Sequence, residues 1–182
     1  MKTRILFPTI IAVLASSLAL FAQNKAATSS EESKLLFVVT PTKTTYAKGE
    51  NVDFTFRLSN RSGDKVLVAK TFQLAHFIVL NIVNAKGKRV EWCGRIASQT
   101  DFPRSFTTLS RGESVSKTIT ISCVNKDDRS RAWGYSLEVP GKYVVTGTYM
   151  LPQPEAFFKK LSPDIPAVRG PVSAQPVTIE IR

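Results

Sequence analysis

The 182-residue chain has little of what catalysis usually requires. It contains one histidine, His76, and no HExxH sequence, so neither a hydrolytic zinc site nor a Ser–His–Asp triad has its usual components. No glycine-rich phosphate loop is present, and the carboxylates occur singly in turns and at strand ends without a spacing typical of glycoside hydrolysis or calcium binding. We therefore expect a protein that is not an enzyme and that holds no metal and no cofactor.

Cysteine is also scarce, since Cys93 and Cys123 are the only two. A CxxC spacing, which a redox site usually has, is absent. An even pair in an oxidising compartment is most simply one disulfide. It would close a loop of about 30 residues and contribute roughly 3–4 kcal/mol. We predict a structural Cys93–Cys123 bridge.

The N-terminal segment, residues 1–22, has the organisation of an export signal. Lys2 and Arg4 precede an apolar run that ends in small residues, which predicts cleavage after Ala19 or Ala22. An uncleaved anchor is the alternative. No second apolar stretch follows, so we expect a secreted or periplasmic protein without an integral membrane segment after cleavage. The polar residues 23–34 are predicted to form a disordered leader.

After removal of residues 1–22, the chain has 23 basic and 14 acidic residues, a net charge of +9. A basic exported protein attracts polyanions, so an anionic envelope polymer or a protein are the expected partners. Nucleic acid is not expected, because export separates the chain from it and no reading motif is present. The basic residues are dispersed along the chain, and an ordinary solvated surface is therefore the alternative.

From residue 35 onward the hydrophobic pattern has a period of two, as in half-buried strands, and no amphipathic helix of ten or more residues is evident. Residues 77–83 are apolar at both parities, which predicts a central strand covered on both faces. The fold class we expect is all-β, an Ig-like antiparallel β-sandwich of about eight or nine strands over residues 35–182. The predicted core comprises Phe54, Phe56, Leu58, Val79, Ile119, Ile121, Tyr143 and Val145.

The period-two pattern stops at residues 151–176, which contain six of the ten prolines and are predicted to form a long loop. Phe157, Phe158, Lys159 and Lys160 place two aromatic rings beside two cations there, a candidate partner-binding element. The alternative is that both rings plug one end of the sandwich. Trp133 follows a polar loop and is a further candidate for partner contact, with packing as its alternative.

Three segments carry a resemblance to known families: YAKGENVDF at 46–54, FTTLSRGES at 106–114 and YSLEVPGKYVV at 135–145. In this order they resemble the Ig-like domain that precedes the catalytic domain of deuterolysin-like metallopeptidases. The hairpin VNAKGKRV at 83–90, before Trp92, also looks like the bacterial intracellular proteinase inhibitor family. The first likeness implies an accessory domain without the zinc-binding residues, and the second implies protease binding.

Both resemblances contain the PGKY turn at 140–143, where Tyr143 can direct its hydroxyl back to the preceding loop. Together with the export signal, they lead us to expect a non-catalytic binding or accessory domain of the cell envelope or secretome. The alternative function is inhibition of secreted proteases. The sequence matches a glycosylation sequon at Asn60-Arg61-Ser62, which matters only in a eukaryotic source.

Overall fold

The computed structural model describes residues 34–93, 103–122 and 134–182. Over these residues the chain is mostly β, with one short α-helix and one 3-10 turn, so the all-β prediction is confirmed. The predicted signal peptide and leader, residues 1–33, lie outside the described residues. Within the described part of the chain, no helix is long and apolar enough to span a bilayer.

Three strands form one antiparallel sheet in the order β1-β3-β7. They are β1 (Leu35–Pro41), β3 (Asp53–Asn60) and β7 (Ser114–Thr120). Strand β3 alternates strictly: Phe54, Phe56 and Leu58 have no exposed surface, while the residues between them face outward. Strand β7 pairs only with β3 among the described residues and is therefore an edge of this sheet.

A second sheet has the order β2-β10-β8-β5, and β9 pairs with the far end of β8. Its strands are β2 (Thr45–Tyr46), β5 (Ile78–Asn84), β8 (Gly141–Tyr149), β9 (Val172–Ser173) and β10 (Val177–Ile181). Only the β2–β10 pair is parallel. A separate two-stranded pair is formed by β4 (Val66–Ala69) and β6 (Phe106–Leu109), which follows the 3-10 turn Pro103–Ser105.

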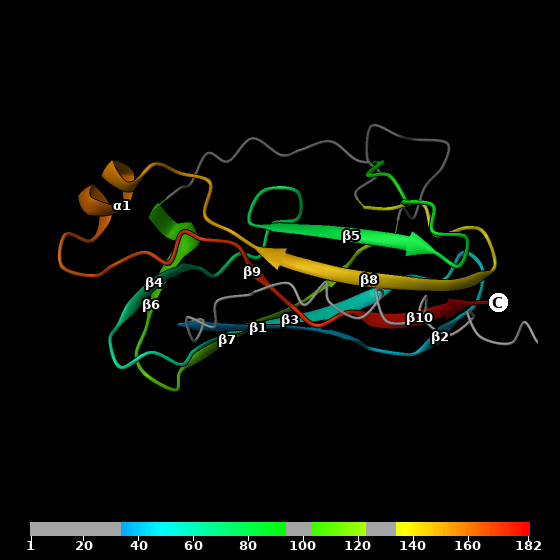
Figure 1. Ribbon diagram of the computed structural model, residues 1–182, viewed down its shortest axis with the longest axis horizontal. Helices are drawn as coiled ribbons and strands as arrows, with labels where there is room; N and C mark the ends of the chain where they lie inside the picture. Colours follow the sequence, from blue (N-terminus) through cyan, green and yellow to red (C-terminus); the bar gives the residue numbers. More distant parts are fainter. Residues whose placement is uncertain (1–33, 94–102, 123–133) are drawn as a thin grey trace, which may run out of the picture. The chain divides into compact units, whose positions relative to one another are not determined.

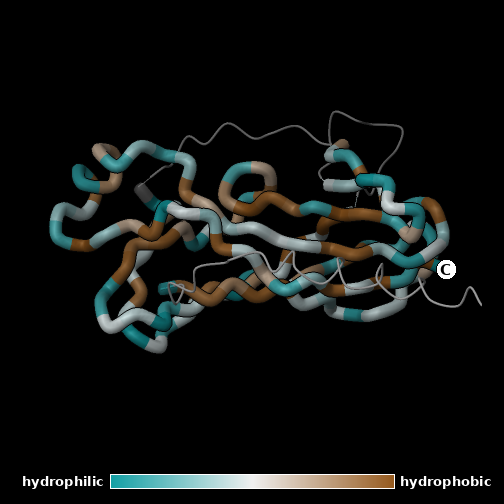
Figure 2. The backbone as a smooth tube through the Cα atoms, viewed as in Figure 1, coloured by the Kyte–Doolittle hydropathy of each residue, from teal (hydrophilic) through white to brown (hydrophobic). Residues whose placement is uncertain are grey.

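The two larger sheets contact each other through a shared core. Phe37 of β1 packs on Phe56 of the same sheet and lies 6.0 Å from the ring of Tyr149 on β8. Gly147 on β8 permits this approach, because a Cβ there would lie 2.6 Å from Val39 Cγ2. In Figure 1, β5 and β8 lie side by side over β1, β3 and β7, and Figure 2 shows hydrophobic residues following the strands.

Two turns use the same arrangement of a glycine and a glutamate. Gly49 and Gly112 both have a positive φ in the left-handed region, a conformation that glycine adopts without steric cost. The following carboxylates accept hydrogen bonds from the backbone three residues earlier, at 2.8 Å for Glu50 and 2.6 Å for Glu113. The Gly-Glu pairs at 49–50 and 112–113 therefore stabilise turns of the same kind, one before β3 and one before β7.

Two predictions about the core require correction. The expectation that residues 77–83 form a central strand covered on both faces is wrong, because Val79 and Asn81 are exposed on one face of β5. Among the described strands, β5 pairs with β8 and lies at the end of its sheet. Ile78, Leu80 and Ile82 are buried, whereas Val79, which was predicted to line the core, is 37% exposed. A β-branched residue favours a strand whether or not its face is covered, so its presence at this position does not indicate burial. Ile119 contacts the core from the β7 edge and is half-buried.

Candidate functional site

The segment carrying Phe157, Phe158, Lys159 and Lys160 is a helix and not an extended loop. Helix α1 (Glu155–Leu161) begins after Pro154 and ends before Ser162, and its last turn contains both lysines. Glu155 pairs with Lys159 at 2.9 Å. This i,i+4 spacing stabilises an exposed helix by a few tenths of a kcal/mol. The 151–176 segment thus contains α1 and β9, two elements that the sequence pattern did not indicate.

Both aromatic rings of α1 contact Phe106 of β6. Phe158 is 2% exposed and meets the Phe106 ring edge-on at 5.5 Å, while the half-buried Phe157 lies 5.7 Å from the same ring. Figure 1 shows α1, β4 and β6 at the same end of the described structure. The side chains of this segment that remain accessible to a partner are therefore the lysines and part of Phe157, while Phe158 belongs to the core.

A hollow of about 350 Å³ lies between α1 and residues 162–169. Its charged groups partly neutralise one another, because Glu155 contacts both Lys159 and, at 4.0 Å, Arg169. The hydrogen bond from Lys159 lowers the pKa of the Glu155 carboxyl. All three side chains are exposed, so these pairs contribute little to stability.

A second hollow combines cations from separate turns. Lys34, Arg61 and Arg111 line a surface depression of about 680 Å³, together with the Asn60–Asp64 turn. Asp64 is the one carboxylate among its lining residues. Asn60 itself is 1% exposed, and its amide donates to the carbonyls of Asp64 and Leu109 at 2.8 and 2.9 Å. A sugar-transfer enzyme cannot reach this side chain in the folded protein.

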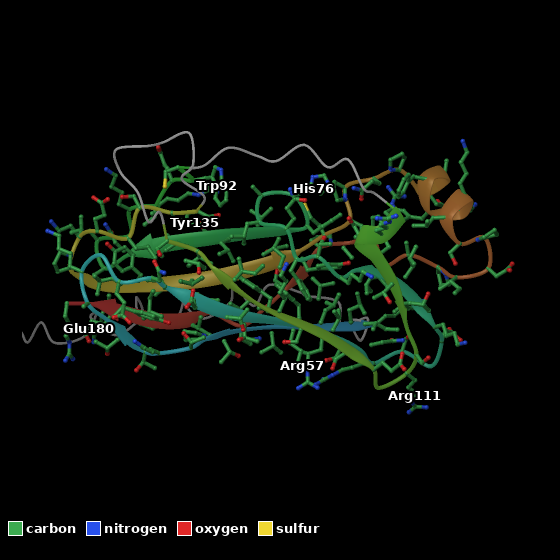
Figure 3. The ribbon with its side chains drawn as sticks, turned by 180° about the vertical axis from the view of Figure 1, so that it is seen from behind. Arg57, His76, Trp92, Arg111, Tyr135 and Glu180 are labelled. Carbon is green, nitrogen blue, oxygen red and sulfur yellow. The ribbon has the colours of Figure 1, made fainter. Side chains whose placement is uncertain are left out.

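A third hollow lies where the edge strand β7 meets the β4–β5 loop and Trp92. This edge groove has a volume of about 390 Å³, and its lining residues are Thr71, Phe72, Gln73, Leu74, Trp92, Lys117, Thr118, Ile119 and Thr120. Its walls come from three segments that are distant in sequence. Trp92 is held by an edge-on contact with Tyr135, 5.3 Å between ring centroids, and the two rings are neighbours in Figure 3.

The edge groove concentrates polar groups without partners. Thr71 Oγ1 and Trp92 Nε1 are both buried and have no hydrogen-bond partner in the described part of the chain. Leaving such a group unpaired costs about 1–3 kcal/mol. Of the three unpartnered buried side-chain atoms among the described residues, two therefore belong to residues of this one groove.

The backbone of the same loop is strained. Phe72 and Ala75 have φ angles of 48° and 62°, and they are the non-glycine residues with positive φ in the described structure. Each such conformation costs on the order of 1–3 kcal/mol and persists only where the surroundings enforce it. Neither the strain nor the unpaired Thr71 hydroxyl had a signal in the sequence, where residues 71–75 look like an ordinary connection.

The remaining predicted residues are only partly described. The backbone N–H of Cys93 donates to the Gly134 carbonyl at 2.8 Å, and the next residue, Tyr135, donates its N–H to Ile121 at 2.7 Å. The chain just before position 123 therefore lies next to the segment that pairs with Cys93. Cys123 and Trp133 themselves lie outside the described residues, so the disulfide and the role of Trp133 stay predictions.

The one histidine is not part of a metal-binding cluster in the described part of the chain. His76 Nε2 is 3.0 Å from Gln153 Nε2, and burial lowers the pKa of the imidazole. Within residues 34–93, 103–122 and 134–182, no three side chains of His, Cys, Asp or Glu are grouped so that they could hold a metal ion. We assign His76 a packing contact with Phe77, whose ring centroid lies 4.5 Å away.

Comparisons with known proteins give little that bears on function. A scan against protein-family models finds no matching family, and a search of curated proteins finds no match. Among solved structures, the chain is similar to AvmM, which is described as catalysing macrocyclization in alchivemycin A biosynthesis. The two share 10% sequence identity with a TM-score of 0.36, over 82% of this chain and 89% of AvmM. A likeness this distant carries no inference about activity.

Proposed function

We propose that this protein is an exported, non-catalytic binding domain with an Ig-like β-sandwich fold, and that its binding site is the edge groove. The packing of the β1-β3-β7 sheet on the β8 sheet through Phe37 and Tyr149 supports the sandwich. So does the Tyr143 hydroxyl, which donates to the Val139 carbonyl at 2.6 Å as the PGKY turn predicted. The signal-like residues 1–22 support export and cleavage.

The observation that carries the binding proposal is the pair of unpartnered atoms, Thr71 Oγ1 and Trp92 Nε1, on residues that line one hollow. Folded proteins pair nearly all buried polar groups, so two orphans beside a single hollow need a physical reason. A bound partner with polar groups offers these atoms the hydrogen bonds that the described part of the chain does not supply. Such a site binds and need not catalyse.

The accessory-domain and inhibitor resemblances both fit a binding role, and they differ in the partner. The experiment is a pull-down from the native extracytoplasmic fraction with the immobilised, processed protein, washed at about 0.15 M and then 0.5 M salt, which shortens screening from about 8 Å toward 4 Å. We expect one protein to be retained through the second wash by the wild type. Trp92→Phe, which keeps an aromatic ring but removes the Nε1 donor, should release it.

Lys86→Glu is the matched control, because Lys86 is exposed in the turn after β5 and does not line the groove. Retention of the same partner by wild type and Trp92→Phe alike would contradict the edge groove as the binding site. A retained protease whose activity falls in proportion to added protein would support the inhibitor function.

A second candidate partner is an anionic envelope polymer, which the hollow lined by Lys34, Arg61 and Arg111 favours. Figure 3 shows that Arg111 and Arg57 lie on the opposite side of the described structure from Trp92. This interaction would be electrostatic, so the high-salt wash should remove it. Loss of a polymer after Arg61→Ala and Arg111→Ala together, without loss of the protein partner, would separate the two surfaces.

A further inference from the structure

We propose that the edge groove binds an extended, acidic segment of a partner protein, which adds a strand to β7. This inference rests on the proposed function and names the class of partner. Strand addition obtains affinity from main-chain hydrogen bonds along a free sheet edge and specificity from alternate side chains. β7 must therefore present free backbone groups along its edge and side chains that contact alternate residues of the added strand.

The first requirement is a row of free backbone groups. The Ile121 N–H donates to the Val52 carbonyl, and the Asn60 N–H donates to the Glu113 carbonyl. These two bonds flank the β3–β7 ladder at odd-numbered residues of the β7 side, so the hydrogen-bonded pairs between them also fall on the odd-numbered residues of β7. The N–H and C=O groups of Ser114, Ser116, Thr118 and Thr120 therefore point away from β3. No strand pairs with this side of β7 among the described residues.

The neighbouring edge of the second sheet is different, because its outward carbonyls already accept hydrogen bonds. The Leu80 carbonyl on β5 accepts a hydrogen bond from the Tyr135 hydroxyl at 3.0 Å, and the Ile82 carbonyl accepts one from Val90 N at 2.8 Å. Proteins usually protect the edges of their sheets in this manner. The β7 edge lacks such cover in the described structure, and it is the edge that adjoins the groove.

The second requirement is a set of side-chain contacts. Directly opposite residues of an antiparallel pair share a face, so Lys117, opposite Phe56, and Ile119, opposite Phe54, lie on the core side of β7. Alternate residues of an added strand would face the same side, toward the partly exposed Ile119, Leu74 and Trp92. That surface offers apolar contact, and the unpartnered Trp92 Nε1 is buried beside it.

Charge determines the preferred sequence of the segment. Lys117 forms no ion pair within the described residues, and no carboxylate is among the described residues that line the groove. A glutamate or aspartate of the partner placed opposite Lys117 would supply the missing negative charge and an acceptor for Trp92 Nε1. The net charge of +9 after signal removal favours the same acidic partner.

Lys117 also argues against a second copy of this chain as the occupant. An antiparallel pair of two β7 strands in full register places Lys117 of one copy opposite Lys117 of the other, because Lys117 is the central residue of Ser114–Thr120. Like charges directly opposite each other destabilise a strand pair, and lysine on an edge strand is a common protection against self-association.

The experiment selects 12-residue peptides from a random phage-displayed library on the processed protein and measures their dissociation constants by fluorescence anisotropy. We expect acidic peptides. Thr118→Pro removes one outward N–H and should weaken binding about tenfold. Thr118→Val keeps that N–H and should leave binding within about twofold, and both variants lose the same hydrogen bond between the hydroxyls of Thr118 and Thr55 on β3. Lys117→Glu should weaken acidic peptides by about tenfold, and Lys86→Glu should not.

A scan of N-methylated peptides tests the same idea without altering the protein. Strand addition predicts that methylation weakens binding at alternate positions only, because alternate peptide N–H groups face β7. Equal effects at all positions, no effect at any, or recovery of no acidic peptide would overturn the proposal. If Trp92→Phe releases the natural partner in the pull-down but Thr118→Pro does not, the binding site stands and strand addition is wrong. If both variants retain it, both proposals fail.

Discussion

Replacing Thr71 with valine should make the protein more stable, which is unusual for a substitution near the core. Valine has nearly the shape of threonine, so Thr71→Val exchanges the buried, unpartnered Oγ1 for a methyl group without opening a cavity. Burying an unpaired hydroxyl costs about 1–3 kcal/mol in proteins. We expect the free energy of unfolding to rise by about 1–2 kcal/mol. For a domain of this size that corresponds to a Tm increase of about 3–6 °C.

The assay is urea unfolding followed by circular dichroism, with the midpoint and slope fitted separately so that a change in stability is distinguished from a change in the unfolded state. Thr120→Val is the matched control from the same groove. Thr120 Oγ1 donates to Asp53 Oδ1 at 2.6 Å. Removal of this hydroxyl should therefore destabilise the protein by about 1 kcal/mol. Because Thr71 is expected to serve binding, Thr71→Val should also weaken retention of the partner.

Thr71→Val and Thr120→Val should change the free energy of unfolding in opposite directions. If Thr71→Val lowers the free energy of unfolding as much as Thr120→Val does, the Thr71 hydroxyl has a hydrogen-bond partner in solution. The argument that the groove contains unsatisfied groups would then be wrong. If Thr71→Val stabilises the protein and leaves partner retention unchanged, the hydroxyl is unsatisfied but has no part in binding.

Three further predictions concern the fold. Tyr149→Phe leaves the buried N–H of Ala69 without its hydroxyl acceptor and should cost about 1–3 kcal/mol. Tyr143→Phe should cost under about 1 kcal/mol, because the hydroxyl bond to the Val139 carbonyl is only partly buried; equal losses in urea unfolding would contradict the assignment. Asn60→Ala should lower the free energy of unfolding by about 2–4 kcal/mol in the same assay, because the carbonyls of Asp64 and Leu109 lose the amide group that donates to them. A near-neutral result would contradict the structural role of this buried amide. The denatured, unreduced processed chain should show no thiol reactive toward Ellman's reagent, and two reactive thiols would disprove the Cys93–Cys123 bridge.

Alternating hydrophobic residues are the signal by which the sequence predicted β3 and β8. Phe54, Phe56 and Leu58 indicated β3, and Tyr143 and Val145 indicated β8, because each strand has one covered face. The two-residue strands β2 and β9 were missed because pairing with β10 and β8 creates them. Helix α1 was missed because only a short segment between prolines forms it, and its rings acquire their contact from Phe106 in a distant segment.

The edge groove could not be predicted from the sequence, because its lining comes from three segments that are distant in sequence. Trp92 stands next to Cys93 in the sequence, and that position alone does not indicate a binding site. The binding role that we propose for Trp92 depends on the nearness of Thr71 and of β7, which no local pattern encodes. Lys117 looked like one of many dispersed cations. Only the register of β7 with β3 places it on the groove side of an edge strand.

The strain in the β4–β5 loop is hard to explain by folding alone. Phe72 gains burial from its unusual backbone, since its ring has no exposed surface, and this burial offsets the strain. Ala75 has no such compensation: its methyl group is small, and glycine would adopt the same positive φ more cheaply. Its N–H is nevertheless fixed to the Ile78 carbonyl at 2.8 Å, which holds the loop in one shape. Strain at Ala75 and an unpaired hydroxyl at Thr71 are separate costs within one short loop. A partner bound in the groove would benefit from a loop already held in place, since a rigid site loses less conformational entropy on binding.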